Sequence, residues 1–122
     1  MIDPYKPLAV LLAGECPNIE PTFPRGQPSF PLLTVSVIDN NSEVILGGAE
    51  RFSGIVVQLD VWDNQPTRER CEQTAQAVSA RMIAAGFSRQ SAPSLEEDHL
   101  HRVSMTFRGT VDNKTFMVYE RS

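Results

Sequence analysis

Residues 52–86 constrain the fold most, because a strand pattern and a helix pattern follow one another there. The odd positions of the first part are all apolar: Ile55, Val57, Leu59 and Val61. Alternation with β-branched residues predicts a strand over residues 52–62 with one buried face. Small or apolar residues then recur at the spacing of one helical stripe: Cys71, Ala75, Val78, Met82 and Ala85. They predict a helix over residues 67–85, closed by Gly86, which tolerates a left-handed conformation.

Two further segments show strand alternation. Residues 32–38 place Leu33, Val35 and Val37 on one face, and residues 101–111 alternate in the same way. After a turn at residues 112–114, residues 115–119 are predicted to pair back as a last short strand. The shared core is predicted to contain Leu59, Val61, Val78, Met82, Met105 and Phe107. The fold class is α+β, a mostly antiparallel β-sheet with one long helix packed on a face; a mixed strand order stays open.

The N-terminal third predicts smaller elements. Residues 8–13 lie between a proline and a glycine, a pattern typical of a short helix, and this N-terminal helix is expected to lie on the sheet. Residues 16–31 contain five prolines and predict an extended connector with an edge strand around residues 19–23. Phe23 and Phe30 are expected to anchor this connector to the domain.

The connection over residues 39–51 is the first functional candidate. It begins with turn-forming residues, and residues 43–46 are expected to extend a hairpin arm. Long connections in small domains are often functional. We therefore predict one domain over residues 1–122, with a projecting hairpin arm at residues 39–51.

Composition excludes several classes of function. The 122 residues suit one domain with a single core, and a net charge of −4 without a basic cluster argues against nucleic-acid binding, including sequence-specific binding. We expect no membrane span and no secretory signal, hence a cytoplasmic protein. The two cysteines are expected to be reduced thiols.

Chemical sites are weakly indicated. His99 and His101 would share a strand face as two metal ligands, but further ligands are lacking and Glu97 is the nearest. Cys71 is a candidate nucleophile near a helix start, although its place on the apolar stripe favours a buried thiol. Residues 88–98, which end in an acidic run at 96–98, are expected to be a solvated loop with at most one short strand. We therefore predict no enzyme, no catalytic residue, no metal site and no cofactor.

The order of these elements resembles a known protein family. The runs at residues 28–31, 59–63 and 101–108, with the long helix between the last two, are similar to the tail terminator, or tail completion, proteins of long-tailed bacteriophages and prophages. The resemblance implies a virion structural protein without enzymatic activity or cofactor. It implies a homo-oligomeric ring, expected to be a hexamer, that caps the tail tube, stops its polymerisation and joins it to the head connector.

This resemblance also implies partners and an interface. The expected partners are copies of the same chain, the major tail tube protein and the head–tail connector protein, in the virion tail and in the host cytoplasm during assembly. A ring subunit needs an arm or an edge that meets its neighbour, and the predicted interface residues are Asn40, Glu43, Val44, Ile45, Leu46 and Arg51. The alternatives are a head–tail adaptor or minor tail protein, and a small cytoplasmic ligand-binding domain with a pocket between helix and sheet.

Overall fold

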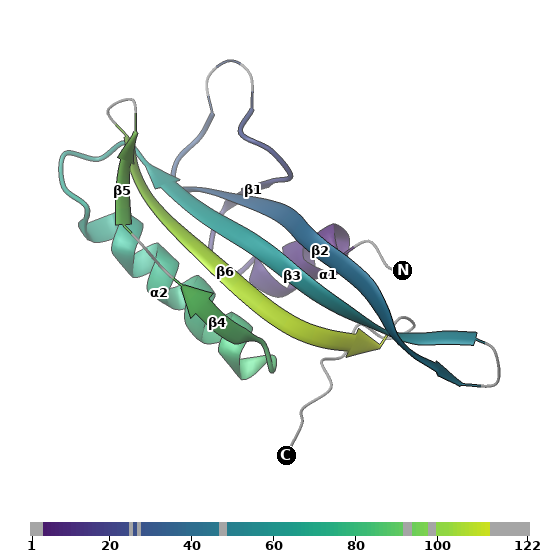
Figure 1. Cartoon of the computed structure of the whole chain (residues 1–122). Coiled ribbons are helices and arrows are strands. Elements are labelled where there is room, and N and C mark those ends of the chain that lie inside the picture. The colour runs from purple at the N-terminus through teal and green to yellow at the C-terminus, as the bar shows by residue number, and fades with distance from the viewer. Residues whose placement is uncertain are drawn as a thin grey trace.

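The computed structural model describes residues 4–24, 26, 28–46, 49–91, 94–97 and 100–112, with the backbone alone at residues 40–46, 49–53, 91, 94–97 and 112. The elements are α1 (Tyr5–Leu12), β1 (Asn18–Glu20), β2 (Leu32–Leu46), β3 (Ala49–Asp63), α2 (Glu69–Ala84), β4 (Ser88–Ser91), β5 (Ser94–Glu97) and β6 (Leu100–Asp112). Figure 1 shows one curved sheet with both helices behind it.

The strands form a six-stranded sheet in the order β1-β2-β3-β6-β4, and β5 also pairs with β6. Neighbouring strands are antiparallel except for β1 and β2, which are parallel. Because β3 occupies the other side of β6, strands β4 and β5 lie along the same outer edge. The predicted mostly antiparallel α+β fold is confirmed, and the parallel β1–β2 pair makes the sheet mixed.

The core fills the space between the helices and one sheet face. In the β3–β6 ladder, Leu59 pairs with Met105 and Val57 with Phe107, so both partners of each pair point to the same face. The six predicted core residues are all buried in one cluster, together with α1 and α2 side chains. At about 25 cal/mol per Å² of buried apolar surface, this single layer is the main source of stability.

Both helices differ from their predicted limits. Helix α2 begins at Glu69 and is 16 residues long, whereas the pattern predicted residues 67–85. Its stripe from Cys71 to Met82 is buried as predicted, and Gly86 has a φ of 102°. Helix α1 begins at Tyr5, so Pro7 lies in its first turn, where a helix needs no amide donor. Its buried Leu8 and Leu12 face the core, as expected for a short helix lying on the sheet.

Several segments expected to be turns or loops are strands. Residues 39–42, expected to be a turn, and residues 49–51 continue β2 and β3 as one antiparallel ladder that includes residues 43–46, expected to extend a hairpin. The ladder has register shifts between Val37 and Asp39, between Ser42 and Val44, and between Val44 and Ile45. Residues 88–91 and 94–97 form two strands where at most one was predicted, because β6 supplies hydrogen-bonding partners to segments that have no apolar alternation. The predicted turn at 112–114 and strand at 115–119 lie almost wholly outside the described residues.

Two predictions for the N-terminal half are corrected, and a third holds in part. Strand β1 ends at Glu20, because only residues 32–34 of β2 pair with it. Val37 is 43% exposed rather than buried, since it lies on β2 beyond the part that β1 borders. Phe23 is an anchor, although a partly exposed one, and its ring meets Trp62 edge-on at 4.9 Å.

Candidate functional site

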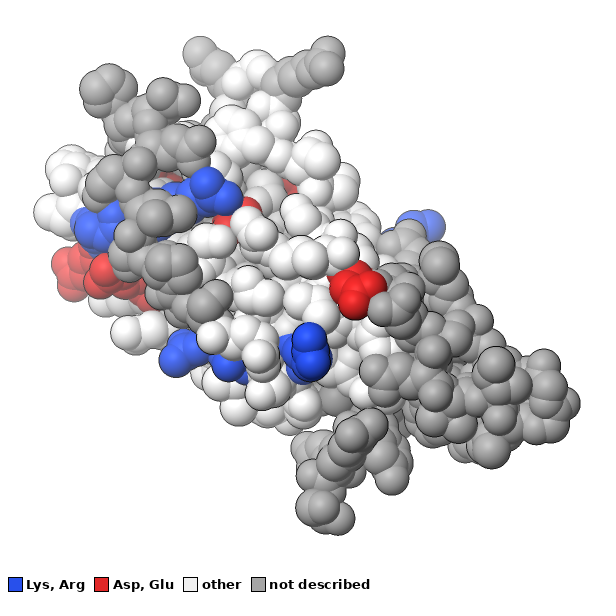
Figure 2. Space-filling view, in the orientation of Figure 1, with Lys and Arg blue, Asp and Glu red and all other residues white. Residues whose placement is uncertain are grey.

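The face of the sheet opposite the helices is covered by no described helix. Figure 1 looks onto this face, and Figure 2 shows it in the same orientation. Its middle, over β2, β3 and β6, consists mostly of uncharged residues, with a few basic and acidic groups standing apart. Such a face offers a broad contact surface and not a pocket.

At one end of this face, Trp62 is held by three neighbours. Its indole Nε1 donates to Thr34 Oγ1 at 3.1 Å, and the Arg102 guanidinium lies 4.6 Å from the ring centre. The Phe23 ring from the proline-rich connector packs against its edge. Trp62 and Thr34 are consequently buried although neither faces the helices.

Asp60 extends this network along β3. Arg102 Nη2 donates to Asp60 Oδ2 at 3.2 Å, and Gln58 Nε2 donates to both carboxylate oxygens at 3.2 and 3.0 Å. Asp60 is only 4% exposed, so these charge-assisted bonds offset the loss of its hydration. The sequence patterns did not indicate this cluster, because the alternation on β3 predicts one buried face and says nothing of the other. The signal that was available is that Gln58, Asp60 and Trp62 occupy alternate positions and so share that other face.

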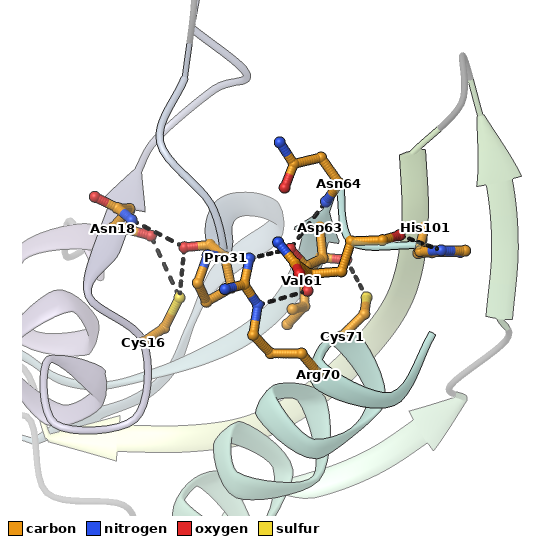
Figure 3. A network of polar contacts seen from close by, with 10 residues as sticks. Cys16, Asn18, Pro31, Val61, Asp63, Asn64, Arg70, Cys71 and His101 are labelled. Carbon is orange, nitrogen blue, oxygen red and sulfur yellow. Dashed lines mark hydrogen bonds and ion pairs between the residues drawn. The ribbon is translucent and has the colours of Figure 1, made fainter. Parts of the chain in front are cut away.

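A second network fastens the end of β3 to the start of α2 (Figure 3). The Asp63 carboxylate is fully buried and accepts hydrogen bonds from Arg70 Nε at 2.8 Å, from Arg70 Nη2 and from the Asn64 amide at 2.9 Å. Burial alone would raise the pKa of Asp63. The hydrogen bonds from Arg70 and Asn64, with the charges of Arg70 and His101, outweigh burial and hold that pKa below its usual value.

Both thiols are structural. Cys71 is fully buried and donates to the Val61 carbonyl at 3.4 Å, and burial raises the pKa of Cys71 to about 11. Cys16 is buried and contacts the Pro31 carbonyl at 3.4 Å, joining the end of α1 to the start of β2. Burial also raises the pKa of Cys16. The nucleophile alternative for Cys71 is therefore wrong, since at neutral pH the thiol is protonated and shielded.

The other candidate chemical residues form no assembled site in the described part of the chain. His101 Nε2 lies 3.0 Å from the Gln65 carbonyl and its Nδ1 lies 3.4 Å from Arg68 Nη1. His99 and Asp98 fall outside the described residues, and Glu97 is described by its backbone alone. Among the described side chains, no group of three His, Cys, Asp or Glu is placed to hold a metal ion.

The predicted interface residues all lie on the long β2–β3 hairpin. Asn40, Glu43, Val44, Ile45 and Leu46 belong to β2, and Arg51 belongs to β3. Their side chains lie outside the described part, so their role at an interface stays a prediction. Phe52 pairs with Asp112 at the end of β6, and the ladder beyond it joins only β2 and β3 among the described residues. Figure 1 shows this tip extending past β6.

Comparisons with known proteins identify the family. None of the described helices combines the length and the apolar character that crossing a bilayer requires. No curated protein matches the chain in sequence. The family model described as "Tail completion protein gp17" matches residues 8–112, which includes every strand and both helices except the first turn of α1. The chain therefore belongs to the phage tail completion protein family, a family of non-enzymatic structural components of the virion tail.

Proposed function

We propose that this tail component caps the tail tube as a closed ring, stops polymerisation of the tube protein and provides the surface that joins the head connector. The stoichiometry of six rests on the family resemblance. The partners are other copies of the chain, the major tail tube protein and the head–tail connector protein. The ring acts by contact alone, without a catalytic step.

The β2–β3 hairpin is the observation that carries this proposal. Its tip extends beyond Asp112, the last described residue of β6, and is bonded to the rest of the described sheet only through its own two strands. An element of this kind reaches away from its own core and is suited to lie against a neighbour. If the arm of each subunit meets a different surface of the next, the contact is heterologous and a fixed rotation closes a ring.

Modest contacts are sufficient for such a ring. Each subunit binds two neighbours, and the tube end presents a matching symmetric template, so the later contacts form at a high effective concentration. Isolated protein is expected to be a monomer when dilute and a ring on the tube. The acidic net charge of −4 suits a ring through which DNA passes without binding.

The arm is tested with purified protein. Light scattering and negative-stain imaging measure the assembly state of the wild type and of a variant whose residues 44–49 are replaced by a short Gly-Ser turn. We expect the variant to melt like the wild-type monomer but to lose rings. A variant that unfolds while its association is unchanged would make this segment part of the core instead.

A phage lacking the gene tests the function. We expect filled heads and tails of abnormal length that fail to join, and restored joining when purified protein is added to tails of normal length. Tails of normal length that remain unjoined would favour the head–tail adaptor alternative. Infectious particles with normal tails would refute both.

A further inference from the structure

The outer edge of β2 is bordered by another described strand over a short distance only. β1 pairs with residues 32–34, and from Val35 onward no described strand lies on that side. The backbone groups along such an edge are a template for another strand. Proteins usually protect such an edge with charges, with proline or by covering it.

This edge also carries exposed apolar side chains. Val37 is 43% exposed and Ile38 is 56% exposed, and Ile38 is the residue at the register shift between Val37 and Asp39. Adjacent exposed apolar residues on an uncovered strand edge are the usual sign of a protein contact.

The opposite edge of the sheet is complementary in direction and in character. β2 and β6 each run antiparallel to β3, and β4 runs antiparallel to β6, so β4 runs opposite to β2. A second copy placed beside the first in the same orientation therefore brings its β4 antiparallel to β2. Ser88, Arg89 and Gln90 of β4 are all exposed.

The strand registers show which residues of the β2 edge and of the β4 edge lie in the same row across the sheet. One row across the sheet reads Asp39, Val56, Arg108 and Ser88, and the next reads Val37, Val57, Phe107 and Arg89. The β2 end of the first row carries the exposed Asp39, and the exposed Arg108 of β6 lies in the same row, one strand in from the β4 edge. Arg89 lies in the row that faces the helices, where its Nη1 donates to Ser79 Oγ of α2 at 3.2 Å. Figure 2 shows an acidic group over β2 and a basic group over β6 on this face. The edges are complementary in charge.

We propose that subunits join edge to edge, with β2 of one copy from Val35 to Asp39 adding antiparallel to β4 of the next copy, so that the sheet continues through the ring. This inference rests on the proposed ring and names the surfaces that close it. The occupant is a second copy of this chain, because a copy in the same orientation presents Arg108 at the level of Asp39.

Cysteine cross-linking tests the pairing. Ser36 on β2 and Ser88 on β4 are both exposed, and Cys16 and Cys71 are buried, so Ser36→Cys and Ser88→Cys introduce the reactive thiols. Within one subunit these positions are three strand spacings, or about 14 Å, apart, so a shorter bismaleimide favours links between subunits. An equimolar mixture of the two single variants, examined as ring preparations on tail tubes, should give dimers only, and the double variant should give a ladder of multimers.

The controls separate edge-to-edge pairing from its alternatives. Dimers of Ser36→Cys alone would show that two β2 edges meet symmetrically, and this would overturn the proposal. Absence of cross-links in rings that imaging confirms would also overturn it, while the ring function would stand. Absence of rings in every preparation, including wild type, would refute the proposed function itself.

A charge exchange provides an independent measurement. Asp39→Arg and Arg108→Asp should each weaken assembly, raising the concentration needed for ring formation by about tenfold, since like charges then meet across the edge. The double variant should recover most of this loss. Val10→Lys is the matched surface control, because Val10 is 80% exposed on α1, behind the sheet face that carries Asp39 and Arg108, and should leave assembly unchanged. Single variants that assemble like wild type, or a double variant that is additive, would contradict the edge contact.

Discussion

Removing Arg70 tests how the end of β3 is fixed to the start of α2. Asp63 has no exposed surface, whereas the Arg70 side chain is 42% exposed. Arg70→Ala deletes two charge-assisted hydrogen bonds to a buried carboxylate and leaves it the Asn64 amide. Hydrogen bonds to charged groups contribute about 1.5–3 kcal/mol each, and the exposure of Arg70 places both at the low end. We expect a loss of about 3 kcal/mol, which lowers the melting temperature by on the order of 10 °C.

Urea denaturation at pH 7 measures this loss. Asp63→Asn and the double variant complete a mutant cycle, in which the coupling isolates the pair. Glu72→Ala is the matched control on the same helical turn, because its 3.5 Å pair with Arg68 is exposed. That control should change stability by about 0.5 kcal/mol or less.

The pH dependence has a definite sign. The folded-state pKa of Asp63 lies below its unfolded value, so the ion pair contributes fully above the usual carboxyl range. Its contribution is lost as the pH falls through the folded-state pKa. The stability difference between wild type and Asp63→Asn should therefore shrink on acidification from pH 5. An Arg70→Ala variant as stable as Glu72→Ala, or a difference that stays constant down to pH 3, would refute this reasoning.

Three further predictions concern the interior. The Val78 side chain is fully buried, so Val78→Ala should lower the free energy of unfolding by about 1–3 kcal/mol, as measured by urea denaturation. Val78→Asp should abolish the cooperative melting transition. A folded Val78→Asp variant would contradict the assigned helix face. Gly109→Ala should lower the free energy of unfolding by about 1–3 kcal/mol, because a Cβ there would lie 2.6 Å from the buried Phe87 ring. Thermal melting measures this loss, and Gly14→Ala is the control, since a Cβ at Gly14 meets nothing within 4 Å. Cys71 should resist alkylation at pH 8 until the protein is unfolded, as thiol counting by mass spectrometry will show, because its pKa is raised to about 11.

Local patterns predicted the parts of the fold that local burial decides. The alternation around Leu59 and the stripe through Val78 report directly which side of an element faces the core, and both are confirmed. The end of α2 is also local, because Gly86 alone readily adopts the required conformation. The start of α2 was less certain, since Arg68 occupies the N-cap without a side-chain capping bond.

Elements that depend on a distant partner were missed. β4 is polar and has no alternating pattern, yet it forms because β6 borders it. Asp60 appeared to be a solvated residue, but Arg102, 42 positions later, makes it a buried ion-pair partner. The exposure of Val37 was missed for the same reason. Its place in an alternating pattern indicated burial, but a side chain is buried only where another element covers it. Which strands pair and which elements cover a strand face depend on tertiary contacts, and these cannot be read from a local sequence pattern.

The two sheet faces separate stability from assembly. Helices α1 and α2 complete the core on one face, so substitutions there act on folding. On the other face the Trp62 cluster is held by Thr34, Arg102 and Phe23 and needs no third layer for its burial. Because both faces of the sheet are stabilised within one subunit, the sheet edges and the β2–β3 hairpin are available to contact neighbouring subunits. If the proposed ring forms through these edges, substitutions there should weaken its assembly and leave the monomer's unfolding unchanged.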